Sequence, residues 1–456
     1  MLAGVSRARI TPGVGTPLEG YAGRGPALHV HDDLEATALA FANGDDVGGD
    51  HGVVPGDVAL VVVACDLVSL GEEEVAGIRR AVEDVVGVPG SRVWVSCSHT
   101  HYGPVTDRSG TSLTVEAPVP PSVAAYLDHL RWTVAGAVAE AVAGVRPATV
   151  SFGSGSTAIG VNRRERLPDG RIILGQNPDG PFDPRVAVVR VDALDGSPVA
   201  AIVNYACHGT SLGSSCRDVS ADFIGKARRV VEAETGATCL YVQGAAGNIN
   251  PVVHYYSWAN PTSLGLQLAS EALGTYWGTK VPLEREDGGQ PVETTSRELS
   301  LPGLVASGSL DEARGRVAGL ELELERREAE GDRSGAYWAK VRLERTRRDV
   351  RVLSGEESAP VVHAEISAAR IGGRVGLVSA PGEVFVEIGT SIVKRSPFDL
   401  TLYCGYTNGS VHYVPTRAAY AEGGYEVDNA CIVAPEAGER LEEESVLLLE
   451  QLASAR

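Results

Sequence analysis

The segment Val58-Ala59-Leu60-Val61-Val62-Val63-Ala64-Cys65 is a run of eight residues without a polar interruption. Such a run is typical of a strand that is buried on both faces of a sheet, because it lacks the alternation of a half-exposed strand. Ser69-Leu70-Gly71-Glu72 follows with the spacing of a capping box, which predicts an amphipathic helix to about Val86. A buried strand followed by a helix is typical of α/β proteins.

The alternation of strands and helices continues for most of the chain. Gly236 is predicted to end one helix, Asn260-Pro261 to begin the next, and Ile371-Gly372-Gly373-Arg374 to connect two antiparallel strands. Strands are predicted at 92–98, 199–206, 238–243, 361–371, 374–379 and 400–405, and helices at 122–143, 222–235, 260–277 and 435–453. We therefore predict an α/β fold, with a mixed β-sheet core flanked by helices, in one large domain spanning 1–456.

The segment 309–351 has a different composition. It is rich in Glu and Arg, has apolar residues at helical spacing, and is interrupted by Gly331-Asp332. This pattern predicts a charged helical hairpin that extends from the sheet core. A solvated hairpin is the simplest interpretation, and a lid or a dimer contact are the alternatives.

Composition restricts the partners and the compartment. The 456 residues include 59 acidic and 40 basic side chains, for a net charge of −19, which repels nucleic acid and anionic membranes. No segment has the roughly 20 apolar residues of a membrane-spanning helix, and the N-terminus lacks a signal-peptide pattern. The seven cysteines form no C-x-x-C pair and are expected to be reduced thiols of a cytoplasmic protein. Oligomeric state stays open.

Histidines lie where several predicted strands end. His99 and His101 are alternate residues at the end of the strand at 92–98, so they are expected to project from the same face. His208 follows the strand at 199–206. Two adjacent imidazoles can hold a metal, or can serve as one ligand and one proton carrier, although histidine also has hydrogen-bonded structural roles. Because open α/β sheets bind ligands at such strand ends, the three histidines are predicted to converge.

Two other strand ends carry polar or glycine-rich sequence. Asp66 follows the first strand, where it can belong to the site or can stabilise the N-terminus of the next helix. The segment Gln243-Gly244-Ala245-Ala246-Gly247-Asn248-Ile249-Asn250-Pro251 can direct N–H groups toward an oxyanion, or can form only a tight turn.

Six short motifs in a fixed order resemble the catalytic domain of the neutral ceramidases, which are zinc-dependent amide hydrolases. The resemblance extends over almost the whole chain. The motifs are 3–12 with His31-Asp32-Asp33-Leu34, Ser98-His99-Thr100-His101-Tyr102-Gly103-Pro104, Asn162-Arg163, 204–211, Pro381-Gly382-Glu383, and 408–413 with Tyr425-Glu426.

The resemblance implies a zinc ion and a role for each matched residue. The implied ligands are His99, His208, Glu383 and Tyr413, the implied proton-transfer group is His101, and Arg163 and Tyr425 would bind or polarise the substrate carbonyl oxygen. Zinc lowers the pKa of a bound water from about 15.7 to about 7, which would supply the nucleophile. For Tyr413 the alternative is a buried phenol that packs beside the site.

The sequence departs from the family pattern in ways that concern the substrate. Asn250 replaces a serine that is linked to activity in the family, so serine-based acyl transfer is not expected, while hydrolysis by zinc and water is unaffected. The chain also ends where the catalytic domain ends, so no C-terminal β-sandwich is expected. We predict cleavage of an acyl amide of a soluble small molecule rather than of a sphingolipid.

Three other functions stay open at this stage. The first is an ester or lactone hydrolase with the same zinc site. The second uses Cys207 or Cys97 as a nucleophile beside a histidine. The third is a metal-binding or interaction module without catalysis. The loop at 105–121 and the helical hairpin are expected to shape the substrate pocket.

Overall fold

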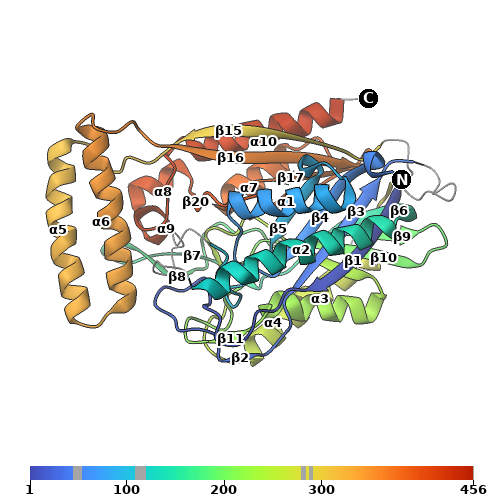
Figure 1. Ribbon diagram of the computed structural model, residues 1–456, viewed down its shortest axis with the longest axis horizontal. Helices are drawn as coiled ribbons and strands as arrows, with labels where there is room; N and C mark the ends of the chain where they lie inside the picture. The colour runs from blue at the N-terminus through green and yellow to red at the C-terminus, as the bar shows by residue number, and fades with distance from the viewer. Residues whose placement is uncertain (45–53, 108–119, 279–283, 287–290, 455–456) are drawn as a thin grey trace.

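The computed structural model describes residues 1–44, 54–107, 120–278, 284–286 and 291–454 (Figure 1). Its largest sheet has the order β12-β10-β9-β6-β1-β3-β4-β5, with β14 paired to β6. These strands are β1 (Leu2–Arg9), β3 (Glu35–Ala42), β4 (Val58–Cys65), β5 (Val93–Cys97), β6 (Arg146–Ser156), β9 (Arg185–Ala193), β10 (Pro198–Tyr205), β12 (Thr238–Gln243) and β14 (Glu284–Glu286). The pairs β4–β5 and β10–β12 are parallel and the other pairs are antiparallel, so the predicted mixed sheet is confirmed.

A second sheet packs against the first. It has the order β15-β16-β17-β19, formed by Glu293–Pro302, Val361–Ile371, Val375–Ser379 and Leu400–Cys404. The predicted hairpin at 371–374 is confirmed, because β16 and β17 pair antiparallel on either side of it. Leu60 and Ile202 of the first sheet share one buried cluster with Leu377 and Leu402 of the second. The hydrophobic core therefore includes the interface between the two sheets.

Helices cover the outer faces of both sheets (Figure 1). On the first sheet, α1 (Glu72–Val86) and α2 (Pro121–Ala143) pack over β1, β3 and β4, while α3 (Asp222–Thr235) and α4 (Ala259–Tyr276) pack over β9, β10 and β12. On the second sheet, α7 (Val386–Arg395) contacts β19, and α10 (Ala437–Ser454) contacts β16. Among the described helices, none has an apolar stretch that could cross a membrane.

Three small sheets and two short helices complete the frame around the site. β2 (His29–Val30) pairs with β11 (Asp218–Val219), and β18 (Glu383–Val384) pairs with β20 (Tyr413–Val414). A small sheet has the order β13-β7-β8, formed by Ile249–Pro251, Gly160–Arg166 and Ile172–Asn177. The short helices are α8 (Arg417–Glu422) and α9 (Tyr425–Asp428).

Two predicted helix caps are wrong. The N-cap of α1 is Gly71 rather than Ser69, and within the described part of the chain no side chain caps this helix. Asn260 lies inside α4, where its side-chain amide donates to the carbonyls of Ser211 and Tyr255 at 3.1 and 2.7 Å. Gly236, in contrast, ends α3 as predicted, in the left-handed conformation with φ 73°.

The predicted helical hairpin is present. Its helices α5 (Leu310–Ala329) and α6 (Arg333–Leu353) lie side by side at one edge of the molecule, with α6 next to the body (Figure 1). Gly331, at the predicted interruption, has φ 71°. Ser309 caps α5 by accepting a hydrogen bond from the backbone N–H of Glu312.

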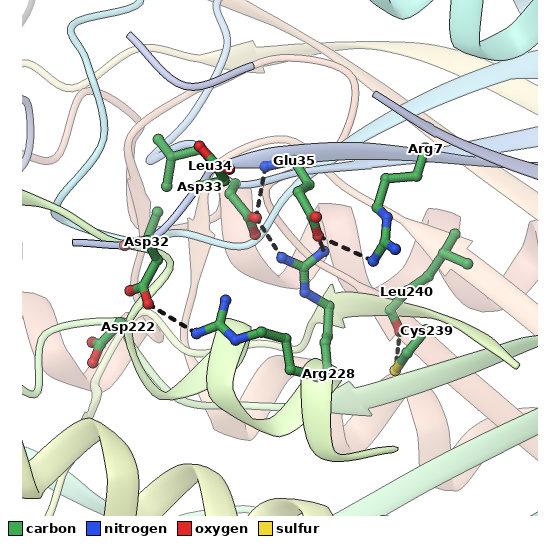
Figure 2. A network of polar contacts seen from close by, with 12 residues as sticks. Arg7, Asp32, Asp33, Leu34, Glu35, Asp222, Arg228, Cys239 and Leu240 are labelled. Atoms are coloured by element: carbon green, nitrogen blue, oxygen red, sulfur yellow. Dashed lines mark hydrogen bonds and ion pairs between the residues drawn. The ribbon is translucent and has the colours of Figure 1, made fainter. Parts of the chain in front are cut away.

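Asp66 belongs neither to the site nor to a helix N-terminus. Its carboxylate accepts hydrogen bonds from Arg228 on α3 and from the backbone N–H of Glu35. Arg228 also pairs with the Glu35 side chain at 3.4 Å, and Glu35 pairs in turn with Arg7 (Figure 2). The buried Arg228–Asp66 pair and the partly exposed pairs of Glu35 join α3 to the ends of β3 and β4, so the role of Asp66 is structural.

Candidate metal and catalytic site

His99 and His101 meet through a turn rather than along a strand. β5 already ends at Cys97, and His99 has a positive φ of 63°, so the predicted strand alternation does not apply. The backbone N–H of His99 donates to Leu67 O, and that of His101 donates to Gly209 O, both at 2.9 Å. The two side chains nevertheless converge as predicted, with their Nε2 atoms 3.1 Å apart.

His208 and Glu383 complete a cluster with these histidines. The Nε2 atom of His208 lies 3.1 Å from Glu383 Oε2, and that of His99 lies 3.4 Å from the same oxygen. One nitrogen from each of the three histidines lies within 4.8 Å of the other two. His99 and His208 are buried, whereas His101 is only half-buried.

Backbone carbonyls set the tautomer of each histidine. The Nδ1 atoms lie 2.7 Å from Val68 O for His99, 3.0 Å from Gly20 O for His101, and 2.8 Å from Ala246 O for His208. A carbonyl only accepts hydrogen bonds, so each Nδ1 carries the proton and each Nε2 directs a lone pair toward the centre of the cluster. Metal-bound histidines are oriented in the same way by their outer contacts.

The protonation state of His208 also leaves it a donor for a cation. Burial, and then the nearby Arg163 guanidinium, lower the pKa of His208 to about 3, so this imidazole is neutral. Three imidazole lone pairs and one carboxylate are a donor set that fits Zn²⁺.

Tyr413 lies beside Glu383 because β18 and β20 pair in parallel, with these two residues in register. Its hydroxyl accepts a hydrogen bond from Arg163 Nη2 at 2.9 Å. Burial raises the pKa of this phenol well above its ordinary value, although the Arg163 charge opposes the effect. Tyr413 thus joins the histidine cluster to Arg163.

Arg163 and Tyr425 occupy the other side of the cluster. Arg163 comes from β7, and its Nη1 atom lies 3.0 Å from His208 Nε2 and 3.2 Å from Asn250 Oδ1. The ring centroid of Tyr425 lies 5.8 Å from Arg163 Cζ and 5.9 Å from the Tyr413 ring centroid. All seven predicted site residues are therefore close together. Asn250 contacts Arg163.

The glycine turn and the cysteines do not supply the predicted alternatives. The N–H groups of Gly244 and Gly247 already donate to the carbonyls of Tyr205 and Val384, both at 2.9 Å, which favours a tight turn over an oxyanion hole. Cys97 and Cys207 are fully buried, and burial raises the pKa of both thiols well above the ordinary value. Neither environment favours a thiolate nucleophile.

A cavity of about 300 Å³ opens onto the cluster. His99, His101, Glu383, Tyr413 and Tyr425 line it, whereas His208 and Arg163 are not among its described lining residues. The cavity is where a substrate would contact the five lining residues.

Sequence analysis did not identify several other lining residues. These are carboxylates from three segments, one indole of the hairpin helix α6 and one tyrosine after β19: Glu19, Glu72, Glu73, Glu74, Asp107, Trp338 and Tyr406. The position of Tyr406 directly after a strand was an available signal, and its ring centroid lies 4.1 Å from that of His99. Asp107 belongs to the loop that was expected to shape the pocket, but 108–119 lie outside the described residues.

Comparisons with known proteins were made for the whole chain. No protein-family model matches it, and no curated protein matches it. Among solved structures, the neutral ceramidase from Pseudomonas aeruginosa matches with a TM-score of 0.71 at 19% identity, over 99% of this chain and 74% of that chain. The chain has the neutral ceramidase fold. A ceramidase complexed with C2 matches equally well, with a TM-score of 0.71 at 18% identity, over 99% of this chain and 75% of that chain.

The ceramidase fold accounts for the order of the motifs. The motifs at 98–104, 204–211, 381–383 and 408–413 lie where strands end, whereas Asn162-Arg163 lies within β7 and Tyr425-Glu426 begins α9. The α/β expectation and the resemblance to neutral ceramidases are confirmed at the level of fold.

Proposed function

We propose that this chain is a zinc-dependent hydrolase that cleaves the amide (N-acyl) bond of a soluble small molecule. The observation that carries the proposal is the convergence of three imidazole lone pairs and the Glu383 carboxylate at a cavity of the neutral ceramidase fold. His99, His208, Glu383 and Tyr413 would hold the ion. When bound, zinc polarises a carbonyl and lowers the pKa of water to about 7.

Arg163 and Tyr425 bind the substrate carbonyl oxygen in this proposal. Negative charge develops on that oxygen during attack, and preorganised donors in a dry site stabilise such charge strongly. The Arg163 side chain is only 5% exposed, and its Nη1 and Nη2 atoms already contact His208 and Tyr413, so a substrate oxygen would have to replace one of these partners. The Tyr425 ring lines the cavity next to it.

His101 carries the proton to the departing amine. Its Nδ1–H bond to Gly20 O leaves the lone pair on Nε2, 3.1 Å from His99 Nε2, to take a proton and to return it to the leaving nitrogen. It is also the half-buried member of the cluster, so it can exchange protons with solvent more easily than His99 or His208.

The cavity lining supports an amide substrate of small size. Carboxylates of Glu72 and Glu73 line the cavity, and among its described lining residues there is no Lys or Arg. A departing amine that becomes an ammonium is favoured in such a field, whereas the alcohol released from an ester gains nothing from it. The volume of about 300 Å³ lies at the lower end of small-molecule sites. The seven unpaired, buried cysteines support a cytoplasmic location.

Hydrolysis of paired substrates tests the proposal. Purified protein is assayed on an N-acyl amide and on the ester with the same acyl group, with its native metal, after chelation, and after zinc is restored. The proposal predicts amide hydrolysis that disappears on chelation and returns with zinc. Activity that survives chelation would refute the metal mechanism. A preference for the ester would make the chain an esterase or lactonase, and stoichiometric zinc without any hydrolysis would favour a binding module.

A further inference from the structure

Two consecutive arginines of β7 reach the same carboxylate. Neighbouring residues of a regular strand point to opposite faces, yet Arg163 and Arg164 both contact Glu426. The pairing of β7 with β8 shifts register between Asn162 and Arg164, and the Asn162 side chain accepts a hydrogen bond from the Arg164 N–H at 3.0 Å. Such bulges redirect side chains, and they are frequent next to active sites.

Glu426 divides its two oxygens between the arginines. Arg163 Nε donates to Oε1 and Arg164 Nη1 donates to Oε2, both at 2.8 Å. The side chains are 5%, 7% and 1% exposed for Arg163, Arg164 and Glu426, so water does not weaken these ion pairs. Charge-assisted hydrogen bonds are strong and directional in such surroundings.

The bond to Nε determines where the rest of the Arg163 guanidinium points. The group is planar, so fixing Nε on Glu426 directs Nη1 and Nη2 toward His208 and Tyr413. The Glu426 charge also offsets the cost of burying the Arg163 cation.

The segment that carries Glu426 is itself fixed. Arg164 Nη2 donates to Gly423 O at 2.9 Å, and Gly424 has φ 98° in a position where a Cβ atom would lie 2.9 Å from Ile172. From the hairpin helix α6, Arg345 donates to the carbonyl of Cys431, just after α9, at 3.2 Å. A carboxylate on so constrained a segment has a defined position.

We infer that Glu426 is a positioning residue for the reaction, and that it acts by holding Arg163 in the orientation that binds the substrate carbonyl. This inference rests on the proposed function, because Arg163 has that task only in a hydrolase. Misplacing a catalytic group by about 1 Å can cost on the order of 100-fold in rate. Glu426 is therefore expected to affect turnover without touching the substrate.

The test compares Glu426→Gln with Glu422→Gln. Glu422 is a matched control because it binds Arg164 Nη2 at 3.2 Å, and also Arg166, from a side chain that is 37% exposed. We expect Glu426→Gln to lower kcat/KM about 100-fold with unchanged zinc content, and Glu422→Gln to stay within about twofold of wild type. If Glu426→Gln does not fold, Glu426→Asp replaces it in the test. The aspartate keeps the charge but withdraws the carboxylate from Arg163, so Glu426→Asp should show the same loss in kcat/KM. A folded Glu426 variant within twofold of wild type overturns the inference.

A double-mutant cycle separates positioning from a general structural effect. In an Arg163→Ala background, Glu426→Gln should change kcat/KM less than twofold, because the group through which it acts is absent. Losses that multiply instead would overturn the inference. The Arg163 Nε–H signal in 15N NMR provides a readout without substrate: it should exchange slowly in wild type and in Glu422→Gln, and rapidly in Glu426→Gln. If wild type hydrolyses no acyl compound, the proposed function fails, and this signal still decides whether Glu426 holds Arg163.

Discussion

Replacing His101 with alanine separates its two possible roles. Its Nε2 atom lies 3.1 Å from His99 Nε2, as close as a fellow zinc ligand would lie, yet the proposal makes it the proton carrier. General acid–base groups contribute about 10²- to 10⁴-fold to rate, which corresponds to about 3–5 kcal/mol in the activation free energy. We expect His101→Ala to lower kcat by that factor and to retain zinc, because His99, His208 and Glu383 stay in place.

The backbone around His101 should survive the substitution. Arg24 donates to the His101 carbonyl oxygen at 2.7 Å, and the His101 N–H bond to Gly209 O does not involve the ring. The assay measures kcat on an N-acyl amide together with zinc per chain by mass spectrometry. His208→Ala is the comparison variant, and it should lose zinc and activity together. Wild-type turnover in His101→Ala would remove its role as proton carrier, and loss of zinc would make it a ligand.

Three further outcomes follow from the buried charges. Arg163→Ala should lower kcat/KM without reducing zinc content, and a loss of metal measured in the same preparation would show that its role has been misassigned. Burial raises the pKa of Asp222 from 3.8 to about 6, so its stabilising contribution is complete below about pH 4 and is lost as pH rises through 6. In urea unfolding, the unfolding free energy of wild type relative to that of Asp222→Asn should therefore fall by about 2 kcal/mol from pH 4 to pH 7. A difference that stays constant with pH would contradict the raised pKa of Asp222. Arg228→Ala leaves the buried carboxylate of Asp66 without its ion pair and should cost about 3–5 kcal/mol in unfolding free energy, against less than about 1 kcal/mol for the exposed Arg229→Ala.

Local patterns in the sequence predicted the elements well but predicted their ends less well. The strand β4 and the helix α3 follow from apolar periodicity, which depends only on neighbouring residues. The caps at Ser69 and Asn260 were wrong because tertiary contacts decide how such side chains are used. Asn260, for example, bonds to Ser211 O, a partner that no local pattern contains.

The site could be predicted as a set of residues, but not as an arrangement. Motif order brought together His99, His208, Glu383 and the others, and the structure places them in one cluster, five members of which line a cavity. The pairing of Glu426 with Arg163 could not be predicted, because it depends on a bulge in β7 and on a contact across 263 positions. Trp338 could not be predicted as a lining residue either. Its helix, α6, otherwise has the charged composition of a solvated surface, and only the folded chain brings its indole to the cavity.

Anomalous diffraction at the zinc absorption edge, from crystals of the purified protein, tests the central claim most directly. The account predicts a single strong peak about 2.0–2.2 Å from Nε2 of His99, Nε2 of His208 and a carboxylate oxygen of Glu383. A zinc-soaked crystal with no peak there, or with its peak at another site, would contradict it.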